Sequence, residues 1–513
     1  MTGAALPTWC VPLLDAGRVR AADGWAIESG AVSSLELMER ASLGLADLVM
    51  EVAPQGRVVV VCGAGNNGGD GYAAARLLRA VGREVVVLAA VAPEQLSGDA
   101  LIQAERLPGD SPRAFAAGEL AGAAVVVDAL LGTGFAGELR GAVGDAVRAL
   151  AVTDAPVVAC DVPSGVDASS GEVAGAAVHA TATATFHAAK PGLHVNPGKA
   201  RAGLVRVIDI GIPRDAPLDQ PDCGLIDDHA LLAELPRRGA ASTKFTSGSV
   251  LVAGGSRGLI GAVVLAATGA MRAGAGYVTA CVPASELPVA AAHLVEAMQL
   301  GLDDDNGHHV AAGAAALLEV AARRGGALVL GPGLGRASPA AQFAREVAVA
   351  APLSLVLDAD GLNAFAGEPE SLAGRGRATV LTPHAGELGR LLGLQAREIE
   401  SRRLHYARAA ARRSAAIVVL KGDDTIIAGP DGVVAISPGA TPALATAGTG
   451  DVLSGAVGAL LARGVEPFQA ACSAVRLHAR AGLIAEQRFG ADGVLAGDVA
   501  QALAVARQQA QRR

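Results

Sequence analysis

The sequence lacks several features that would define its class at once. Its six cysteines form no Cys-x-x-Cys pair, so neither a zinc site nor a thiol redox motif is indicated. The formal net charge of -8 at pH 7 argues against a general nucleic-acid surface. No apolar run reaches the ~20 residues of a membrane-spanning helix, and no basic segment leads into such a run at the start. We therefore expect a cytoplasmic protein with reduced cysteines and with neither a membrane nor a nucleic-acid partner.

Length and composition favour two domains in this chain. A length of 513 residues exceeds what a single core usually organises, and a hydrophobic content of 51% supplies enough material for two cores. The stretch from about residue 211 to residue 245 carries several prolines and polar residues, which is typical of a connection between domains. We therefore predict a first domain over residues 1–215, a linker over 216–245 and a second domain over 246–513.

Apolar runs alternate with amphipathic segments in both halves of the chain. Continuous apolar strands separated by helices predict parallel sheets, so both halves are expected to be doubly wound α/β domains, and we find no repeat that relates them. Helices are predicted over 34–52, 450–463 and 469–488. Strands are predicted over 57–62, 84–90, 124–128, 156–161, 180–186 and 204–210, and then over 249–253, 276–282, 327–330, 353–358, 379–382, 416–421, 424–428 and 433–437.

A glycine-rich loop from Gly63 to Gly71 follows the first of these strands and opens a helix. Free backbone N–H groups at a helix N-terminus bind anions, so the loop predicts a phosphorylated ligand. Its glycines fit the dinucleotide pattern Gly-x-Gly-x-x-Gly. A dehydrogenase of that type would carry an acidic residue about 20 positions on, and the strand over 85–90 ends without one. We therefore predict phosphate binding without hydride transfer.

Two aspartates, Asp128 and Asp161, stand at the carboxyl ends of later strands of the same half. Ligands bind at that edge in open α/β sheets, so both side chains should converge with the glycine-rich loop on one crevice. A single aspartate in such a place is more often a helix cap or a turn residue. Three loops of this kind at one sheet edge favour a ligand site.

These motifs, together with residues 23–28 and 37–41 and the Lys-Pro-Gly sequence at 190–192, resemble the YjeF N-terminal domain, the NAD(P)H-hydrate epimerase family. The resemblance implies a Rossmann-like doubly wound fold and a potassium ion, a hard cation that suits oxygen ligands. It makes Asp161 the candidate acid/base for interconverting the two C6 configurations of the hydrate, and leaves Lys190 as either a second polar group or a loop cation. The implied hydrate-binding residues are Asn66, Asn67, Gly68, Gly69, Asp70, Gly132, Thr133, Gly134, Phe135, Ala136, Gly137, Glu138 and Asp161, and the implied potassium ligands are Asn67, Asp128 and Ser164.

A second glycine turn, Gly448-Thr449-Gly450-Asp451, opens a helix near the end of the chain. Its backbone amides suit a phosphoryl group, and Asp451 suits the task of taking a proton from an attacking hydroxyl. This is kinase-like machinery, yet no Walker sequence Gly-x4-Gly-Lys-Ser/Thr occurs. The turn over residues 421–425 offers a lysine and a threonine hydroxyl to hold a nucleotide instead, although a Lys-Gly turn alone is more often structural.

With the segments 331–335, 358–363 and 382–387, this turn resembles the YjeF C-terminal domain, the ADP-dependent NAD(P)H-hydrate dehydratase of ribokinase-like fold. The resemblance covers roughly residues 245–503, and it gives His384, which alone would more often be structural, a place in the site. Ile260 departs from the aromatic or polar residue expected there. The implied hydrate-binding residues are Ala262, Gly333, His384 and Asp451, and the implied nucleotide-binding residues are Lys421, Gly422, Asp423, Asp424, Thr425 and Gly450.

Both resemblances together imply a bifunctional repair enzyme for hydrated NADH and NADPH. One half would interconvert the (R) and (S) hydrates, and the other would dehydrate the (S) form with ADP as co-substrate, releasing AMP and phosphate. Asp161 and Asp451 are the candidate catalytic residues. Magnesium is expected on the nucleotide phosphates, and a homo-oligomer is implied. Two alternatives stay open: a ribokinase-type kinase for a small alcohol, and a first half that only binds ligands or partners.

Overall fold

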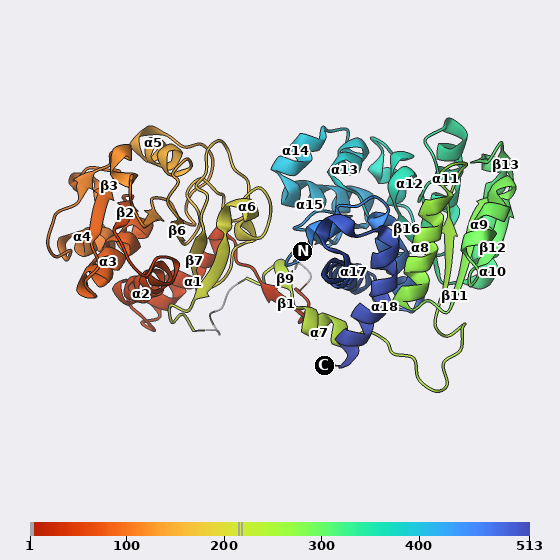
Figure 1. Cartoon of the computed structure of the whole chain (residues 1–513), viewed down its shortest axis with the longest axis horizontal. Coiled ribbons are helices and arrows are strands. Elements are labelled where there is room, and N and C mark those ends of the chain that lie inside the picture. Colours follow the sequence, from red (N-terminus) through yellow and green to blue (C-terminus); the bar gives the residue numbers. More distant parts are fainter. Residues whose placement is uncertain (1–4, 214–215, 217–218, 513) are drawn as a thin grey trace. The chain divides into compact units, whose positions relative to one another are not determined.

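The computed structural model describes residues 5–213, 216 and 219–512, and the chain forms two compact units. One unit runs from Pro12 to Cys223 (Figure 1). The other combines the residues up to Val11 with those from Gly224 onward. The predicted break after residue 215 lies outside the described residues, and part of the predicted linker, residues 223–233, forms a strand and a helix of the second unit.

The first unit is built around a seven-stranded sheet with the strand order β4-β3-β2-β5-β6-β7-β8. Every neighbouring pair in it is parallel, and the order reverses between β2 and β5, which defines a doubly wound sheet. Its elements are α1 Ala16–Glu28, α2 Ser34–Val52, β2 Val58–Cys62, α3 Asn66–Ala80, β3 Val85–Ala89, α4 Gly98–Glu105, β4 Arg113–Ala114, β5 Val125–Ala129, α5 Gly141–Leu150, β6 Val157–Cys160, β7 Ala182–Phe186, α6 Lys199–Ala202 and β8 Leu204–Ile208.

The valine run of β2 explains the layers of this unit. Val58 and Val60 pack with α2 and α3 on one face of the sheet, whereas Val59 and Val61 pack with α5 on the other. Figure 1 shows α2 and α5 on opposite sides of the strands. Side chains alternate between the faces of a strand, so a strand covered on both faces must be apolar throughout.

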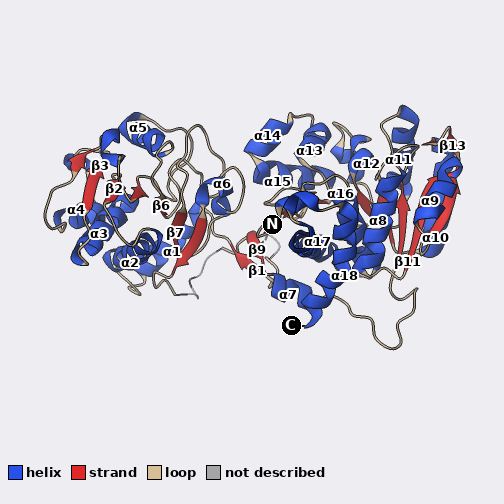
Figure 2. Ribbon diagram, in the orientation of Figure 1, coloured by secondary structure: helices blue, strands red, loops and turns tan. Residues whose placement is uncertain are grey.

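The second unit contains an eleven-stranded sheet with the order β1-β9-β20-β19-β18-β17-β16-β15-β10-β11-β12 (Figure 2). From β12 to β18 all neighbours are parallel, and the order reverses between β10 and β15. Its strands are β1 Cys10–Pro12, β9 Cys223–Ile226, β10 Ser249–Ala253, β11 Tyr277–Pro283, β12 Met298–Leu302, β15 Ala327–Leu330, β16 Ser354–Leu357, β17 Thr379–Leu381, β18 Ile417–Leu420, β19 Ile426–Ala428 and β20 Val434–Ile436, with a separate hairpin of β13 Asp304–Asp305 and β14 His308–His309.

Helices cover this sheet and bury its apolar strands. One core cluster joins alternate residues of β10, such as Val250 and Val252, to α8, α16, α17 and α18, and the intervening Leu251 is equally buried. The helices are α7 Asp228–Ala233, α8 Ile260–Ala273, α9 Leu287–His293, α10 Ala314–Arg324, α11 Ser338–Ala350, α12 Ala359–Asn363, α13 Ala385–Leu392, α14 Ala396–Ser401, α15 Arg403–Ser414, α16 Thr449–Ala462, α17 Pro467–Phe489 and α18 Ala496–Arg512.

The fold class predicted from the sequence is confirmed: both halves are α/β domains built on parallel sheets. Each predicted strand is present within a few residues of its expected bounds. The expectation of parallel pairing is wrong for two pairs, β18 with β19 and β19 with β20, which are antiparallel because short turns, and no helices, connect them. Among the described residues, no helix combines the length and the apolar character that crossing a membrane requires.

Close packing of α8 against α16 depends on a glycine. A Cβ atom built on Gly455 of α16 would lie 2.0 Å from the backbone oxygen of Ala266 in α8, whereas one built on Gly497 of α18 meets nothing within 4 Å. We therefore predict that Gly455→Ala forces the helices apart and lowers the free energy of unfolding by about 1–3 kcal/mol. Chemical denaturation of Gly455→Ala beside the control Gly497→Ala measures this, and equal stability of the two variants would contradict it.

Candidate active sites

A cavity of about 670 Å³ lies at the carboxyl ends of the strands in the first unit. It adjoins the loops after β2 and β5, where the strand order reverses, which is the usual ligand position in such sheets. Gly68, Gly69, Gly137 and Glu138 are not part of the cavity wall. The predicted hydrate-binding residues that line it are Asn66, Asn67, Asp70, Gly132, Thr133, Gly134, Phe135, Ala136 and Asp161.

Asp161 follows β6 with its backbone in the left-handed region, at a φ of 66°. Such a conformation costs a non-glycine residue of order 1–3 kcal/mol and persists where the surroundings enforce it, often at functional sites. Its carboxylate accepts a hydrogen bond from the Thr133 backbone N–H at 3.0 Å and another from the Thr133 hydroxyl. The strained backbone therefore aims the Asp161 side chain at the loop that follows β5.

Lys190 is fully buried beside Asp161. Its Nζ donates to Asp161 Oδ1 at 2.6 Å, to Thr185 Oγ1 at 2.8 Å and to the Phe186 carbonyl at 2.9 Å. Burial acts to raise the pKa of Asp161, but the charge and hydrogen bond of Lys190, helped by Thr133, outweigh burial and hold that pKa below its ordinary value. Lys190 is thus a buried counterion and keeps Asp161 ionised.

Two of the three predicted potassium ligands, Asp128 and Ser164, contact each other. Asp128 accepts hydrogen bonds from the Ser164 hydroxyl at 2.6 Å and from the Ser164 N–H at 2.8 Å. Burial raises the pKa of Asp128 to about 6, and no cationic side chain of the described residues offsets this. The Asn67 amide nitrogen is buried without a hydrogen-bond partner in that part of the chain, and turning the amide over would present its oxygen there. Oxygen donors around an uncompensated carboxylate fit a hard monovalent cation.

Two further carboxyl groups, Asp70 and Asp23, face the same cavity. Burial, followed by the charges of Asp161 and Asp23, raises the pKa of Asp70 well above its ordinary value. Asp23 belongs to α1 and not to a strand end, so sequence reasoning about strand ends gave it no role. The one sequence signal for it was its presence in the N-terminal motif at residues 23–28.

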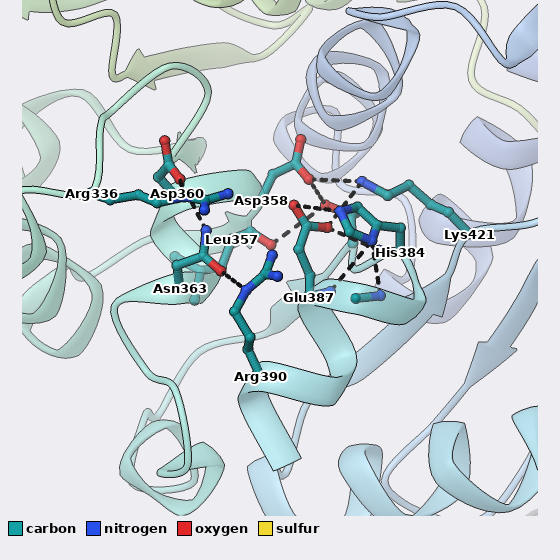
Figure 3. Close-up of polar contacts among 11 residues, drawn as sticks. Arg336, Leu357, Asp358, Asp360, Asn363, His384, Glu387, Arg390 and Lys421 are labelled. Carbon is teal, nitrogen blue, oxygen red and sulfur yellow. Dashed lines mark hydrogen bonds and ion pairs between the residues drawn. The ribbon is translucent and has the colours of Figure 1, made fainter. Parts of the chain in front are cut away.

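The second unit gathers charged side chains at the carboxyl ends of β16, β17 and β18 (Figure 3). Lys421 Nζ lies 3.2 Å from Asp358 Oδ1 and 3.6 Å from Glu387 Oε2, and Asp358 also accepts a hydrogen bond from the Thr382 hydroxyl at 2.7 Å. Burial acts to lower the pKa of Lys421, but Asp358 and Glu387 outweigh it and raise that pKa. The segments that contain Asp358 and Glu387 are named in the sequence analysis, but neither residue is given a role there.

Asp451 lies in the first turn of α16, next to this cluster. A Cβ atom built on Gly450 would lie 3.4 Å from Lys421 Nζ, which brings the predicted nucleotide-binding residues Gly450 and Lys421 together. Burial, then the charge of Asp358, raises the pKa of Asp451 to about 7. A carboxyl group poised near neutral pH at a helix N-terminus is suited to general-base chemistry on a phosphate ligand.

The predicted hydrate-binding residues of this unit come from the first turns of α8 and α16, from the loop after β15 and from the N-cap of α13. A Cβ atom on Gly333 would lie 3.0 Å from the Cβ of Ala262, so these two residues are in contact. His384 caps α13 through Nδ1, which accepts from the Gly386 N–H at 3.0 Å, and its ring is about half exposed (Figure 3). Ile260 is buried in the core cluster, so its departure from expectation is a matter of packing.

The turn over residues 421–425 is organised by its own side chains. Asp424 is buried and forms an ion pair with Arg403, with 2.8 Å between Nη2 and Oδ1. The Thr425 hydroxyl donates to the Gly422 carbonyl at 2.6 Å and closes the turn. Asp424 and Thr425 therefore shape this turn, and sequence reasoning missed Arg403, whose position in α15 carries no motif. Two further contacts in Figure 3 join Asn363 to Asp360 and to Arg390.

Each unit thus places an aspartate and lysine pair next to a helix whose first turn contains glycine. This arrangement is typical of an α/β enzyme, with one candidate site in each unit. The family model described as YjeF-related protein N-terminus matches residues 34–192, and the model described as NAD(P)H-hydrate dehydratase matches residues 250–504.

Relatives match nearly the whole chain. A bifunctional NAD(P)H-hydrate repair enzyme of Salinibacter ruber is 41% identical over 510 residues, covering 94% of this chain and 93% of its own. The enzyme of that name from Moorella thermoacetica is 38% identical, with 91% of each chain covered. The chain therefore belongs to the family of bifunctional NAD(P)H-hydrate repair enzymes, as the sequence predicted. The crystal structure of an ADP/ATP-dependent NAD(P)H-hydrate dehydratase from Bacillus subtilis is 30% identical with a TM-score of 0.46, covering 55% of this chain and 97% of its own.

The buried Lys190 and Asp161 pair generates a stability prediction. Replacing Lys190 with methionine keeps its volume but leaves a buried carboxylate without a counterion, so we expect Lys190→Met to lower the free energy of unfolding by about 3–5 kcal/mol. The control, Arg148→Met, breaks the exposed pair with Asp145 and should change little. Adding Asp161→Asn to Lys190→Met should recover part of the loss. Chemical denaturation tests this, and losses of equal size in both single variants would contradict it.

Proposed function

We propose that this chain repairs hydrated NADH and NADPH in two steps at two sites. The first unit interconverts the (R) and (S) configurations at C6 of the hydrate, and the second dehydrates the (S) form at the expense of ADP. The observation that carries the proposal is the placement of two aspartates. Asp161 lies in the wall of a cavity, 2.6 Å from Lys190, and Asp451 lies in the first turn of α16, where Lys421 approaches the neighbouring Gly450. Membership of the repair family supports the same assignment.

In the first unit, the cavity wall receives the hydrate and Asp161 acts as the acid/base. Most of the predicted hydrate-binding residues of this cavity come from the α3 N-terminus and the loop after β5. Both segments offer backbone N–H groups to phosphate oxygens. Lys190 keeps Asp161 in the ionised form that accepts a proton. The matched segment of the family model ends at residue 192, just beyond Lys190.

Potassium belongs to this proposal, with Asn67, Asp128 and Ser164 as its ligands. Bound there, it would supply a positive charge to the buried Asp128 carboxylate beside the substrate loops. Ser164 connects the proposed cation site to the loop after β5, because its hydroxyl also accepts a hydrogen bond from the Leu131 N–H at 2.9 Å. The cation would therefore fix the start of the loop that carries Gly132 and Thr133.

The potassium proposal predicts a salt-specific epimerase. Exchanging potassium for tetramethylammonium at constant ionic strength should slow epimerisation by about tenfold or more, because the loop after β5 loses its anchor. The Asp128→Asn variant should epimerise the hydrate slowly in both salts. The control variant Asp145→Asn, on the exposed surface of α5, should epimerise it at the wild-type rate in each salt. Measurement of hydrate interconversion by chromatography without ADP gives these rates. Equal wild-type rates in both salts would exclude a functional potassium ion.

In the second unit, Asp451 takes the proton of the C6 hydroxyl, whose oxygen attacks the β-phosphoryl group of ADP and releases AMP. The ring-nitrogen lone pair then expels phosphate, and loss of a proton from C5 restores the dihydropyridine. Lys421 and the α16 N-terminus stabilise the phosphoryl charge. Magnesium on the nucleotide phosphates would neutralise the charge that develops during transfer. Among the described residues, no three acidic, histidine or cysteine side chains group to hold a metal themselves.

The role of Asp451 predicts a pH dependence. Its pKa is raised to about 7, and only the ionised form accepts a proton, so kcat/KM for dehydration should fall about tenfold per pH unit below pH 7. Asp451→Asn should lower kcat by about 100-fold or more while ADP affinity changes less than about threefold. Recovery of absorbance in the near ultraviolet follows the reaction. Near wild-type dehydration by Asp451→Asn would exclude this role.

A kinase for a small alcohol is the second candidate, because the α16 N-terminus and Asp451 suit any phosphoryl transfer to a hydroxyl. The two differ in their products: a kinase leaves a stable phosphate ester, and the repair reaction leaves free phosphate and restored NAD(P)H. Phosphorus NMR of one reaction mixture separates them, and the same mixture with ATP in place of ADP tests the nucleotide preference. A homo-oligomeric state stays part of the proposal on family resemblance.

A further inference from the structure

Asp23 is a cavity carboxyl group to which the proposed chemistry gives no task. It projects from the middle of α1, is half-buried, and lines the 670 Å³ cavity together with Asp161 and Lys190. The other carboxyl groups of this wall, Asp70, Asp99 and Asp161, come from α3, α4 and the end of β6. Asp23 therefore contributes a carboxyl group from a different element of the unit.

The Asp23 carboxyl group makes no hydrogen bond and no ion pair within the described part of the chain. Lys190 is the cation whose charge acts on Asp23, but its three donors are already taken by Asp161, Thr185 and Phe186. The ammonium group thus has no N–H left for Asp23. A side chain that lines a cavity and has no protein partner is available to a ligand.

The surroundings shift the pKa values of Asp23 and Asp161 in opposite directions. Burial raises the pKa of Asp23 to about 6; the charge of Lys190 acts against this shift, and the negative charge of Asp161 adds to it. Lys190 and Thr133 hold the pKa of Asp161 below its ordinary value. One cavity therefore contains two carboxyl groups with separated pKa values, which is the pattern of an acid and base pair.

We propose that Asp23 is the second catalytic residue of the epimerase: it exchanges a proton with the ring nitrogen N1 of the hydrate while Asp161 acts on the C6 hydroxyl. This inference rests on the proposed epimerase function and adds a proton donor to it. Geometry carries it, since both carboxyl groups face one cavity from α1 and from the end of β6.

The reaction closes on itself with these two residues. Asp161 removes the proton of the C6 hydroxyl, the O–H electrons form a C=O bond, and the C6–N1 bond breaks. Its electron pair goes to N1, which takes the proton of Asp23, and the ring opens to an aldehyde. Rotation about C5–C6 turns the other face of the aldehyde toward N1. Ring closure returns one proton to Asp23 and takes the other from Asp161, so both residues regain their starting states.

The test uses the full-length chain without ADP, so that dehydration cannot consume the hydrate. A sample enriched in one epimer is followed by chromatography, and the uncatalysed rate is subtracted. Asp23→Asn should lower kcat by about 100-fold or more, while hydrate affinity changes less than about threefold. The matched control is Glu28→Gln, an exposed carboxylate near the end of the same helix, which should keep the wild-type rate.

A pH profile separates proton donation from a structural role. The charged groups that line the cavity with Asp23 are Arg20, Asp70, Asp99, Asp161 and Lys190. Only the protonated acid can donate, so the wild-type rate should fall as the pH rises past about 6, and Asp23→Glu should stay active with this limb displaced. A wild-type rate independent of pH between about 5 and 8 would overturn the proposal even if Asp23→Asn did not fold.

Three outcomes distinguish this inference from the function on which it rests. Folded Asp23→Asn with a rate within about threefold of the wild type overturns the role of Asp23 and leaves the epimerase intact. Absence of epimerisation by the wild type overturns the epimerase function itself. Incorporation of one labelled oxygen from ¹⁸O water in every epimerisation would mean that the hydroxyl leaves, and would overturn proton transfer to N1.

Discussion

Burial of a carboxylate at the end of a parallel strand is the constraint on which both sites depend. Such a group is stable as an anion only with a partner charge and hydrogen bonds, and each unit supplies one lysine for the purpose. Lys190 is fully buried and has all of its donors engaged, and its charge lowers the pKa of Asp161. Lys421 lies between Asp358 and Glu387 and is partly accessible, so it can also face a ligand.

The same constraint separates the two aspartates that the proposed chemistry uses. Asp161 has its counterion in direct contact and is acidic, whereas Asp451 is surrounded by more negative than positive charge and titrates near pH 7. A difference in neighbours, and not in residue type, therefore lowers the pKa of one aspartate and raises the pKa of the other to about 7. Family membership gives both sites the same substrate pool in the proposed repair cycle.

Sequence reasoning located the loops of both sites because strand ends are legible in a sequence. Continuous valine runs such as 58–61 and the aspartates that follow later strands predict one sheet edge, and the structure has that edge. Two side chains on helices were given no role, Asp23 on α1 and Arg403 on α15. The direction in which each side chain points depends on how its helix packs, which the sequence does not show. Strands β1, β9 and β12 were also missed, because these strands of three to five residues leave no clear periodic signal.

The position of β1 beside β9 has a consequence for how the chain is made. The Asp227 N–H donates to the Trp9 carbonyl at 2.9 Å. The chain passes from the second unit to the first just after Trp9 and returns just before Asp227, so this hydrogen bond joins the two connections within the second unit. In topological terms the first unit is an insertion near the start of a discontinuous domain. During synthesis from the N-terminus, β1 emerges first and waits for its partner until the whole inserted unit has left the ribosome. The first unit can fold within that interval, before the sheet of the second unit is complete.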